Sequence, residues 1–187
     1  MSILKKHTDI IKKSQERSAA YGVEKHRIYS SKILPEEEVK AIIEKHNDLL
    51  TIAKPFLEDL FEIVEGTGFI IILTDSEGCI LDIKGDDETL KAANELNMII
   101  GAYMDEKSVG TNAMGTALSE DTPIQVSAKE HFITAYHRWT CSAAPIHDAN
   151  GSIIATLNLT ASKDKVHPHT LGMVISIAKA IEFFIEN

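Results

Sequence analysis

The sequence predicts an α+β fold in which helices cover the faces of a mainly antiparallel central sheet. Apolar segments of strand length occur in two pairs, at 69–84 and 140–160, and turn-forming residues separate the members of each pair. Such pairs are typical of β-hairpins, whose strands run antiparallel. Long amphipathic helical patterns lie before and after these strands, at 36–64 and from Pro168 onward. Helices grouped around hairpins, rather than alternating with single strands, are typical of the α+β class.

The composition is that of one globular domain with additional helices. The chain has 187 residues, of which 44% are hydrophobic and 25% charged. Its 19 basic and 28 acidic residues give a formal net charge of −9, which is a poor match to nucleic acid or an anionic membrane. We therefore expect no direct nucleic-acid contact and no membrane partner. Cys79 and Cys141 form no CxxC pair and residues 1–13 lack a long apolar core, so we expect a cytoplasmic protein.

The N-terminal segment is predicted to be a helix followed by an irregular connector. Residues 1–20 have an amphipathic helical pattern that ends at Tyr21-Gly22, and residues 23–35 have no regular pattern. We therefore divide the chain into an N-terminal helix and connector, 1–34, and a globular domain, 35–187. The globular domain includes a long helix near each of its ends, and these two helices are expected to pack together.

A long helix is predicted from Pro35 to residue 64. Its apolar residues are spaced alternately four and three apart, which is a heptad pattern. Pro55 removes one backbone N–H and is expected to kink or split the helix. Two interpretations stay open, because this seam could pack on the chain's own sheet or partly on a second copy. The residues of the seam are Val39, Ile43, His46, Leu50, Ala53, Leu57, Leu60 and Val64.

The later elements follow from turn and capping signals. The Asn150-Gly151 pair is a strong signal for a hairpin turn. The last helix, after Pro168, has apolar residues over about 220° of its circumference, so one sheet surface cannot bury them all. Its second face is expected to pack on the helix at 36–64, on a second subunit, or on both. The other expected elements are strands at 69–75, 79–84, 122–127, 140–147 and 152–160, helices at 86–97 and from 112, and a short helix or loop at 130–138.

A stretch of small residues at 110–118 is predicted to begin a helix that forms the wall of a small-molecule pocket. Asn112 or Thr111 can cap this helix by accepting a hydrogen bond from an unpaired N–H of its first turn. Gly110 and Gly115 have the spacing of a phosphate-binding loop, but that loop needs Lys and Ser or Thr after the second glycine. We therefore reject nucleotide-phosphate binding by this element.

The strand that begins at Trp139 is the predicted partner surface of this helix. Small residues follow the tryptophan at 140–144, and small side chains on a central strand leave volume beneath a helix. A cavity lined by an aromatic ring and a few polar groups suits a small ligand. Tight packing without a cavity is the alternative. His131 and Cys141 could also form a redox or metal site, although their spacing matches no compact zinc pattern.

Several blocks of the sequence, in order, resemble the N-terminal GAF sensor domain of sigma-54-dependent transcriptional activators, in the group that regulates acetoin catabolism and the dihydroxyacetone operon. The resemblance extends to Ser14-x2-Arg17, Tyr21-Gly22 and 168–171, and so covers nearly the whole chain. The blocks are Glu106-x3-Gly110-Thr111-Asn112-Ala113-Met114-Gly115-Thr116-Ala117-Leu118, Pro123, Glu130-His131-Phe132 and Trp139-Thr140-Cys141-Ser142-Ala143-Ala144-Pro145-Ile146.

The resemblance implies a GAF fold with a dimer surface on one side of the sheet and a ligand pocket on the other. It also implies downstream ATPase and DNA-binding domains, which are absent from this chain. We therefore expect a dimeric domain that senses a small-molecule effector of unknown identity, with no enzymatic activity and no cofactor. The expected ligand-binding residues are Tyr103, Met104, Thr111, Asn112, Thr116, His131, Phe132, Trp139 and Cys141.

Two other functions stay open on the sequence. The first is a protein-docking module whose pocket holds no ligand. The second is a redox or metal sensor that uses Cys141 and His131. A cysteine-based enzyme, such as the methionine sulfoxide reductases that share this fold, is disfavoured because Cys79 and Cys141 offer no obvious resolving arrangement.

Overall fold

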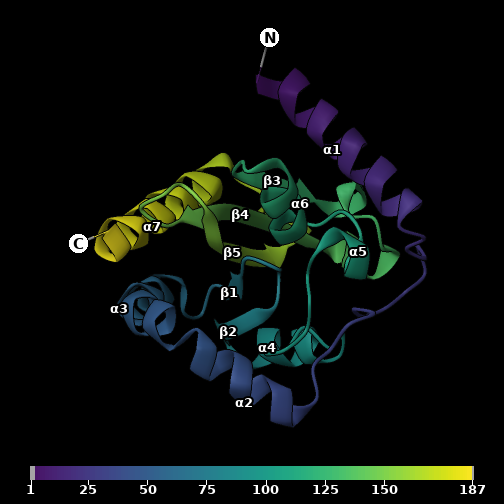
Figure 1. Cartoon of the computed structure of the whole chain (residues 1–187). Coiled ribbons are helices and arrows are strands. Elements are labelled where there is room, and N and C mark those ends of the chain that lie inside the picture. The colour runs from purple at the N-terminus through teal and green to yellow at the C-terminus, as the bar shows by residue number, and fades with distance from the viewer. Residues whose placement is uncertain (1–2, 187) are drawn as a thin grey trace.

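The computed structural model describes residues 3–186, with side chains from Lys6 onward (Figure 1). Met1 and Ser2 of the predicted first helix lie outside this part. The described elements are α1 (Ile3–Ala20), α2 (Glu36–Lys45), α3 (Asn47–Val64), β1 (Ile70–Asp75), β2 (Ile80–Gly85), α4 (Asp87–Asn94), α5 (Glu106–Val109), α6 (Ala113–Glu120), β3 (Ile124–Ser127), η1 (Ala128–Glu130), η2 (Thr134–Arg138), β4 (Trp139–His147), β5 (Ile153–Ser162), η3 (Lys163–Lys165) and α7 (Pro168–Glu186), where η marks a 3₁₀-helix.

The central sheet has five strands in the order β2-β1-β5-β4-β3. The pairs β1–β2 and β4–β5 are antiparallel hairpins, which confirms both predicted hairpins. β1 also pairs with β5, so the two hairpins join side by side, and β3 pairs with β4 at one edge. This register places Cys141 opposite Thr160, and Asn158 between Ile72 and Ala143.

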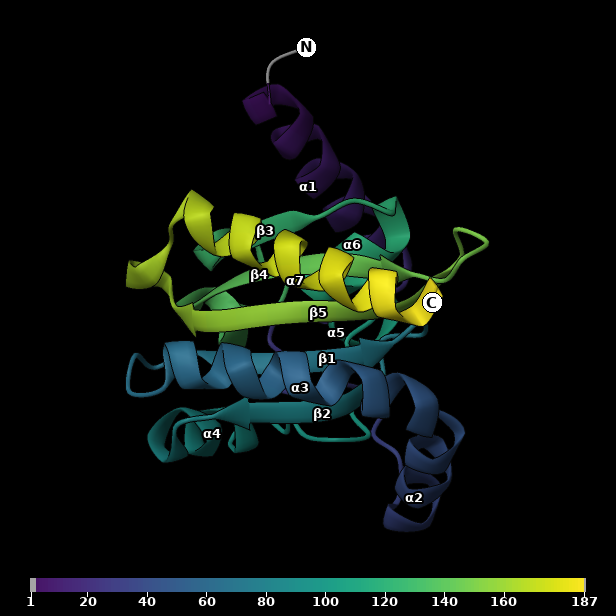
Figure 2. The same ribbon diagram turned by 90° about the vertical axis from the view of Figure 1, so that its left-hand side faces the viewer.

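The two faces of the sheet carry different helices. Figure 2 shows α3 and α7 in front of the strands, with α6 and α5 behind them. Leu57 and Leu60 of α3 share a core with Val174, Ala178 and Ile181 of α7 on the front face. The rear face has a second core, to which α6 contributes Ala113, Met114 and Ala117. The predicted α+β class, with the sheet between helices, is therefore confirmed.

The predicted helix at 36–64 is interrupted at His46, and Pro55 does not split it. His46 leaves the helical conformation between α2 and α3, and its Nε2 lies 3.6 Å from Oδ2 of Asp75 at the end of β1. Pro55 lies on the exposed side of α3, where water can pair with the carbonyl that lacks its partner. The break therefore lies at His46, while α3 runs through Pro55 without interruption.

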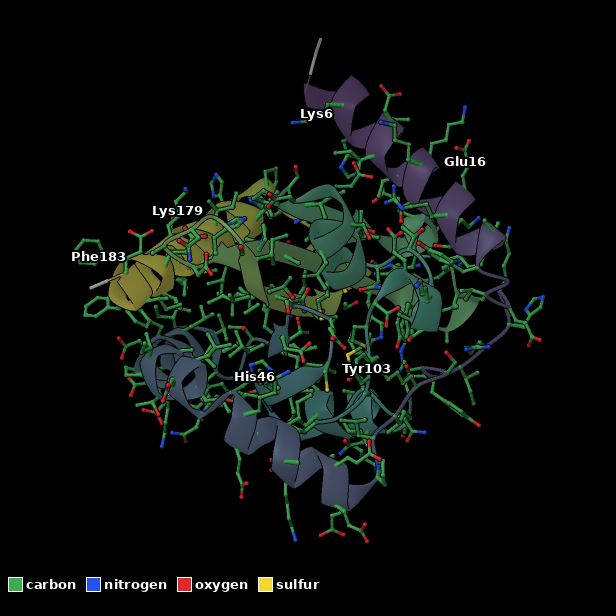
Figure 3. All side chains as sticks on the ribbon, viewed as in Figure 1. Lys6, Glu16, His46, Tyr103, Lys179 and Phe183 are labelled. Carbon is green, nitrogen blue, oxygen red and sulfur yellow. The ribbon has the colours of Figure 1, made fainter. Side chains whose placement is uncertain are left out.

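The last helix, α7, packs on α3. This was one of the alternatives predicted for its second face. The rings of Phe56 and Phe184 meet edge to face with centroids 5.4 Å apart. Phe183 points away from the body of the molecule (Figure 3), and Ile63, Phe183 and Phe184 are each more than half exposed. α7 is long and apolar enough to cross a membrane by length and composition alone, but here one of its faces packs on the sheet.

Truncation of a buried residue on α3 should be costly, whereas truncation on its outer face should not. We expect Leu60→Ala to lower the free energy of unfolding by about 2–5 kcal/mol, because the fully buried side chain leaves a cavity. Ile63→Ala is the matched control, since Ile63 is 68% exposed, and should change stability by less than about 0.5 kcal/mol. Urea unfolding followed by circular dichroism measures both. Equal losses would contradict the burial of this face.

Candidate functional site

The helix predicted at 110–118 begins as expected, with Asn112 as its N-cap. The Oδ1 atom of Asn112 accepts a hydrogen bond from the N–H of Gly115 at 3.1 Å. Its Nδ2 donates to the carbonyls of Met104 at 2.7 Å and Gly110 at 2.9 Å. The side chain of Asn112 therefore fixes the start of α6 to the preceding loop.

The two glycines of this stretch allow close packing. Gly110 has a φ of +73°, and a Cβ there would lie 2.5 Å from the Cβ of Phe132. A Cβ on Gly115 would lie 2.6 Å from the carbonyl oxygen of Met104. Both distances are too short for any side chain, so these glycines bring α6 and Phe132 against the loop. This packing accounts for the Gly-x4-Gly spacing without a phosphate.

A buried polar network joins α1 to α5 and α6. Ser14 donates to Oε1 of Glu106 at 2.6 Å and lies 2.8 Å from Oγ1 of Thr111 and 3.0 Å from Oγ1 of Thr116. Nε and Nη2 of Arg17 donate to the two oxygens of Glu106 at 2.7 and 3.0 Å. Hydrogen bonds from both Ser14 and Arg17 therefore converge on this buried carboxylate.

This network determines what three of the predicted ligand-binding residues contact. Thr111 and Thr116 face Ser14 of α1, and Asn112 forms hydrogen bonds with the neighbouring backbone. All three are buried, with protein groups as their partners. The sequence signal that locates this network is Ser14-x2-Arg17, whose serine and arginine lie one helical turn apart.

Further buried polar side chains lie on β4, on β5 and in residues 131–136, just before β4. The polar atoms that have no hydrogen-bond partner among the described residues include Nε2 of His131, the hydroxyl of Tyr136, Nε1 of Trp139 and Oδ1 of Asn158. Buried polar groups are normally paired, so an unpaired group indicates a bound water or ligand, or a functional role. We call these four residues, together with Cys141, the interior cluster.

Two separate sets of contacts join members of the interior cluster, one between His131 and Tyr136 and one on the sheet. The rings of His131 and Tyr136 meet edge to face, with centroids 6.0 Å apart. On the sheet, Thr160 donates to Sγ of Cys141 at 3.0 Å, and Nδ2 of Asn158 donates to Oγ1 of Thr160 at 2.8 Å. Asn158, Thr160 and Cys141 thus form a chain of hydrogen bonds across β5 and β4. Oδ1 of Asn158 remains unpaired.

Burial keeps the interior cluster uncharged at neutral pH. It lowers the pKa of His131 to about 4 and raises the pKa of Cys141 to about 12. The pKa of Tyr136 is also raised by burial. Imidazole, thiol and phenol are therefore neutral near pH 7, and the cluster offers hydrogen bonds without net charge. Among residues 3–186, no three His, Cys, Asp or Glu side chains are grouped so that they could hold a metal.

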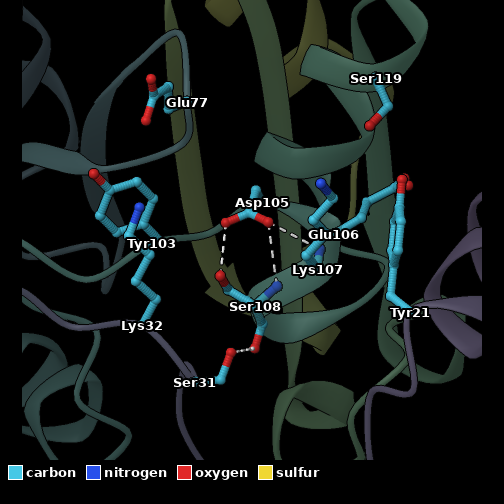
Figure 4. Close-up of a pocket in the computed structure, with 10 residues that line it drawn as sticks. All are labelled: Tyr21, Ser31, Lys32, Glu77, Tyr103, Asp105, Glu106, Lys107, Ser108 and Ser119. Atoms are coloured by element: carbon cyan, nitrogen blue, oxygen red, sulfur yellow. Dashed lines mark hydrogen bonds between the residues drawn. The ribbon is translucent and has the colours of Figure 1, made fainter.

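The structure brings some predicted site residues together and separates Tyr103 from them. Met104, Phe132, Trp139 and Cys141 share the rear core. The ring of Tyr103 instead lines a surface hollow of about 490 Å³, where Nζ of Lys32 lies 3.5 Å from the centroid of the ring (Figure 4). Tyr103 and Met104 point to opposite sides because adjacent residues of an extended chain alternate.

Tyr136 and Asn158 were not predicted as site residues. Asn158 could have been found, because Thr156, Asn158 and Thr160 put polar side chains at alternate positions of an otherwise apolar strand. Such alternation on a strand that is buried on both faces marks one polar face. Tyr136 lies in a 3₁₀-helix of mixed composition, and no periodicity distinguishes it.

An open groove lies on the outside of the molecule, between α1, β3 and the start of α7. It has a volume of about 1230 Å³ and is mainly apolar, and Lys6, Lys129 and Lys163 lie along it. Its apolar lining residues are Ile10, Ile11, Pro123, Ile124, Ala128, Val166, Pro168 and Leu171.

The sequence matches the GAF domain family over residues 48–185. The chain belongs to this family. This GAF domain is 43% identical over 176 residues to a signal-transduction and transcriptional-control protein of Clostridium beijerinckii, covering 94% of this chain and 28% of that protein. It is 38% identical over 151 residues to the acetoin dehydrogenase operon transcriptional activator AcoR of Bacillus subtilis, covering 81% of this chain and 25% of that protein.

A solved structure confirms the GAF fold. The Escherichia coli DhaR(N)–DhaL complex contains a chain that matches this one with a TM-score of 0.88, at 23% identity, over 94% of this chain and 60% of that chain. The predicted resemblance to acetoin and dihydroxyacetone operon regulators is thereby confirmed. The chain spans about a quarter of the length of the curated relatives that it matches.

Removal of the Arg17 guanidinium should destabilise the domain. We expect Arg17→Met to lower the free energy of unfolding by about 2–3 kcal/mol, because it leaves the carboxylate of Glu106, whose side chain is 2% exposed, without a cation. Lys12→Met on the same helix is the matched control, since the Lys12–Glu16 pair is exposed and should contribute less than about 0.5 kcal/mol. Thermal and urea unfolding measure both. A similar loss in the two variants would show that α1 is not held by this pair.

Proposed function

We propose that this GAF domain is the effector-sensing part of a cytoplasmic sigma-54-dependent transcriptional activator, and that it binds a small uncharged molecule at the interior cluster. The observation that carries the proposal is the group of four buried polar atoms without partners, on His131, Tyr136, Trp139 and Asn158. An unpaired buried donor or acceptor costs about 1–3 kcal/mol. A ligand that pairs with several of them recovers this free energy, so the arrangement favours binding.

The chemistry of the cluster suggests the ligand class. The indole of Trp139 only donates, Oδ1 of Asn158 only accepts, and the phenol of Tyr136 can do both. A small molecule that carries a hydroxyl next to a carbonyl matches this set. The names of the relatives refer to acetoin and dihydroxyacetone, both compounds of this kind. No charged group is needed on the ligand, because the cluster itself is neutral.

The rest of the domain supports a signalling role. Ile63, Phe183 and Phe184 on α3 and α7 are exposed, and we propose that they form the surface on which two copies pair. Effector binding would change how these helices pair, since a ligand can shift only states that it binds differently. Downstream ATPase and DNA-binding domains would receive the change, consistent with the greater length of the relatives.

The hydroxyl of Tyr136 provides a sharp test of the site. Calorimetric titration with acetoin and dihydroxyacetone should give saturable binding, and Tyr136→Phe should weaken it about tenfold by removing one hydrogen bond. In the free protein the same variant should be as stable as the wild type or more stable, because it removes an unpaired buried hydroxyl. Tyr21→Phe is the control, since Tyr21 is exposed on the surface.

The lone tryptophan supplies a second measurement. Trp139 is buried in the cluster, so its fluorescence should shift when the ligand binds. Absence of binding to either compound at millimolar concentration, or equal binding by Tyr136→Phe and the wild type, would contradict the proposed site.

Docking of a partner protein is the second candidate function. The observation that favours it is the open apolar groove, whose volume exceeds the roughly 300–1,000 Å³ of ordinary small-molecule pockets. Lys6, Lys129 and Lys163 make no ion pair among the residues whose side chains are described, so they are available to an acidic partner. The solved relative was crystallised as a DhaR(N)–DhaL complex.

Charge reversal at the groove tests this candidate. The double variant Lys129→Glu and Lys163→Glu should weaken binding of purified DhaL at least tenfold, as measured by biolayer interferometry, because it reverses the charge beside the groove. Lys54→Glu on α3, outside the groove, should leave binding unchanged. Failure of the wild type to bind DhaL, or equal effects of the two changes, would count against docking at this groove.

The redox or metal alternative has less support. The raised pKa of Cys141 keeps its sulfur as a thiol near pH 7, whereas the thiolate is the nucleophile and the metal ligand. Thr160 already donates a hydrogen bond to this sulfur. We therefore propose that Cys141 lines the binding region and performs no redox chemistry.

A further inference from the structure

Two consecutive acidic residues at the end of α6 connect this helix to both terminal helices. Glu120 accepts a hydrogen bond from Nη1 of Arg17 in α1 at 2.5 Å. Asp121, the C-cap of α6, lies with Oδ1 2.7 Å from Nε2 of His147. Nδ1 of His147 lies 2.7 Å from Oε1 of Glu182 in α7. His147 therefore bridges a carboxylate at the end of α6 and a carboxylate of α7.

The geometry requires His147 to be an imidazolium. Ionised carboxylates only accept hydrogen bonds, and a neutral imidazole has a single N–H. Both ring nitrogens face carboxylate oxygens at 2.7 Å, so both must carry a proton. The backbone N–H of His147 also donates to Oε1 of Glu182 at 2.9 Å. The hydrogen bonds to Glu182 and Asp121 outweigh the effect of burial, so the pKa of His147 is raised.

The bridge crosses from one face of the sheet to the other. α6 packs on the rear face, and α7 packs on the front face, so the sheet separates them (Figure 2). His147 is the last residue of β4, where the pairing with β5 becomes irregular between Ile146 and His147. This end of the strand is the place where one side chain can reach carboxylates from both layers.

Asp148, the next residue, also lies near the imidazolium. Its carboxylate accepts hydrogen bonds from the N–H groups of Ser152 and Asn150 at 2.9 Å, which lower the pKa of Asp148, and the positive charge of His147 is a further cause of this shift. The ring nitrogens of His147 form their hydrogen bonds with Asp121 and Glu182. Lys179 and Glu186 lie about one turn before and after Glu182 on α7, and both are exposed. Asp121 and Glu182 are therefore the two partners that His147 holds.

We propose that His147 is a positioning residue that couples α6, on the rear face of the sheet, to the terminal helix α7 on the front face. It does so only while protonated. This inference rests on the proposed function, because it supplies the route from the interior cluster to the helix pair. Above its pKa the imidazole keeps one N–H and can hold only one of the two carboxylates. The unprotonated nitrogen then faces the other carboxylate and cannot donate to it. The link between α6 and α7 through His147 is therefore lost.

Hydrogen–deuterium exchange of the ligand-free chain tests the coupling. At about pH 6, Asp121→Asn should increase the exchange rate of the α7 amides at least threefold relative to the wild type, although Asp121 is not on that helix. At about pH 9, after correction for intrinsic exchange, Asp121→Asn should exchange no faster than the wild type, because a neutral His147 no longer holds both carboxylates. Asp148→Asn is the matched control, since it removes a neighbouring carboxylate that acts on the ring by its charge but forms no hydrogen bond with it.

The pH dependence of stability gives an independent check. A histidine whose pKa is raised in the folded state stabilises it fully below the unfolded value of about 6.5, and this contribution is lost as pH rises through the folded pKa. The difference in thermal midpoint between the wild type and His147→Gln should therefore be largest near pH 6 and become smaller as the pH rises through the raised pKa of His147.

An unchanged α7 exchange rate in Asp121→Asn at pH 6, or an equal increase at both pH values, would overturn the coupling. Both measurements use the protein without ligand. A failure to bind acetoin or dihydroxyacetone would contradict the proposed site and leave this result standing, so the two failures are distinguishable.

Discussion

The carboxylate of Glu106 is the constraint that holds the N-terminal helix α1 on the rest of the domain. Its side chain is 2% exposed, and a buried charge must be paired and hydrogen-bonded to be tolerated. Ser14 and Arg17 supply that pairing from a helix far away in the sequence. The requirement holds α1 on α5 and α6, and it turns the hydroxyls of Thr111 and Thr116 toward α1 instead of the interior.

The interior cluster shows how far residue types alone lead to a candidate site. Trp139 and Cys141 were predicted from the small residues that follow the tryptophan, and His131 from the block Glu130-His131-Phe132. The structure places Trp139 and Cys141 in the rear core. Tyr136 and Asn158 complete the cluster from a 3₁₀-helix and from the central strand. The positions of these two side chains beside Cys141 depend on contacts formed only in the folded domain, such as the pairing of β4 with β5. Local sequence patterns do not predict such contacts.

The fold was predictable where local chemistry decides it. Asn112 caps α6 and Asn150-Gly151 turns the last hairpin because side-chain capping and positive φ act within a few residues. The break at His46 was not predicted, and the Asp75 carboxylate that lies 3.6 Å from its ring belongs to a strand distant in the sequence. Pro55 does not split α3, although a split was one of the two predicted outcomes, and it lies on the exposed side of the helix, where water can pair with the freed carbonyl.

The pairing of β1 with β5 has a consequence for the order in which the domain can assemble. Each hairpin can close by itself, but the sheet is completed only when Ile70 meets Thr160, near the opposite end of the chain. During synthesis β1, which is buried along its whole length in the finished domain, must wait for β5 to emerge. Its apolar Ile70-Ile71-Ile72-Leu73 run is exposed during that interval, which makes β1 the segment most vulnerable to aggregation before folding ends.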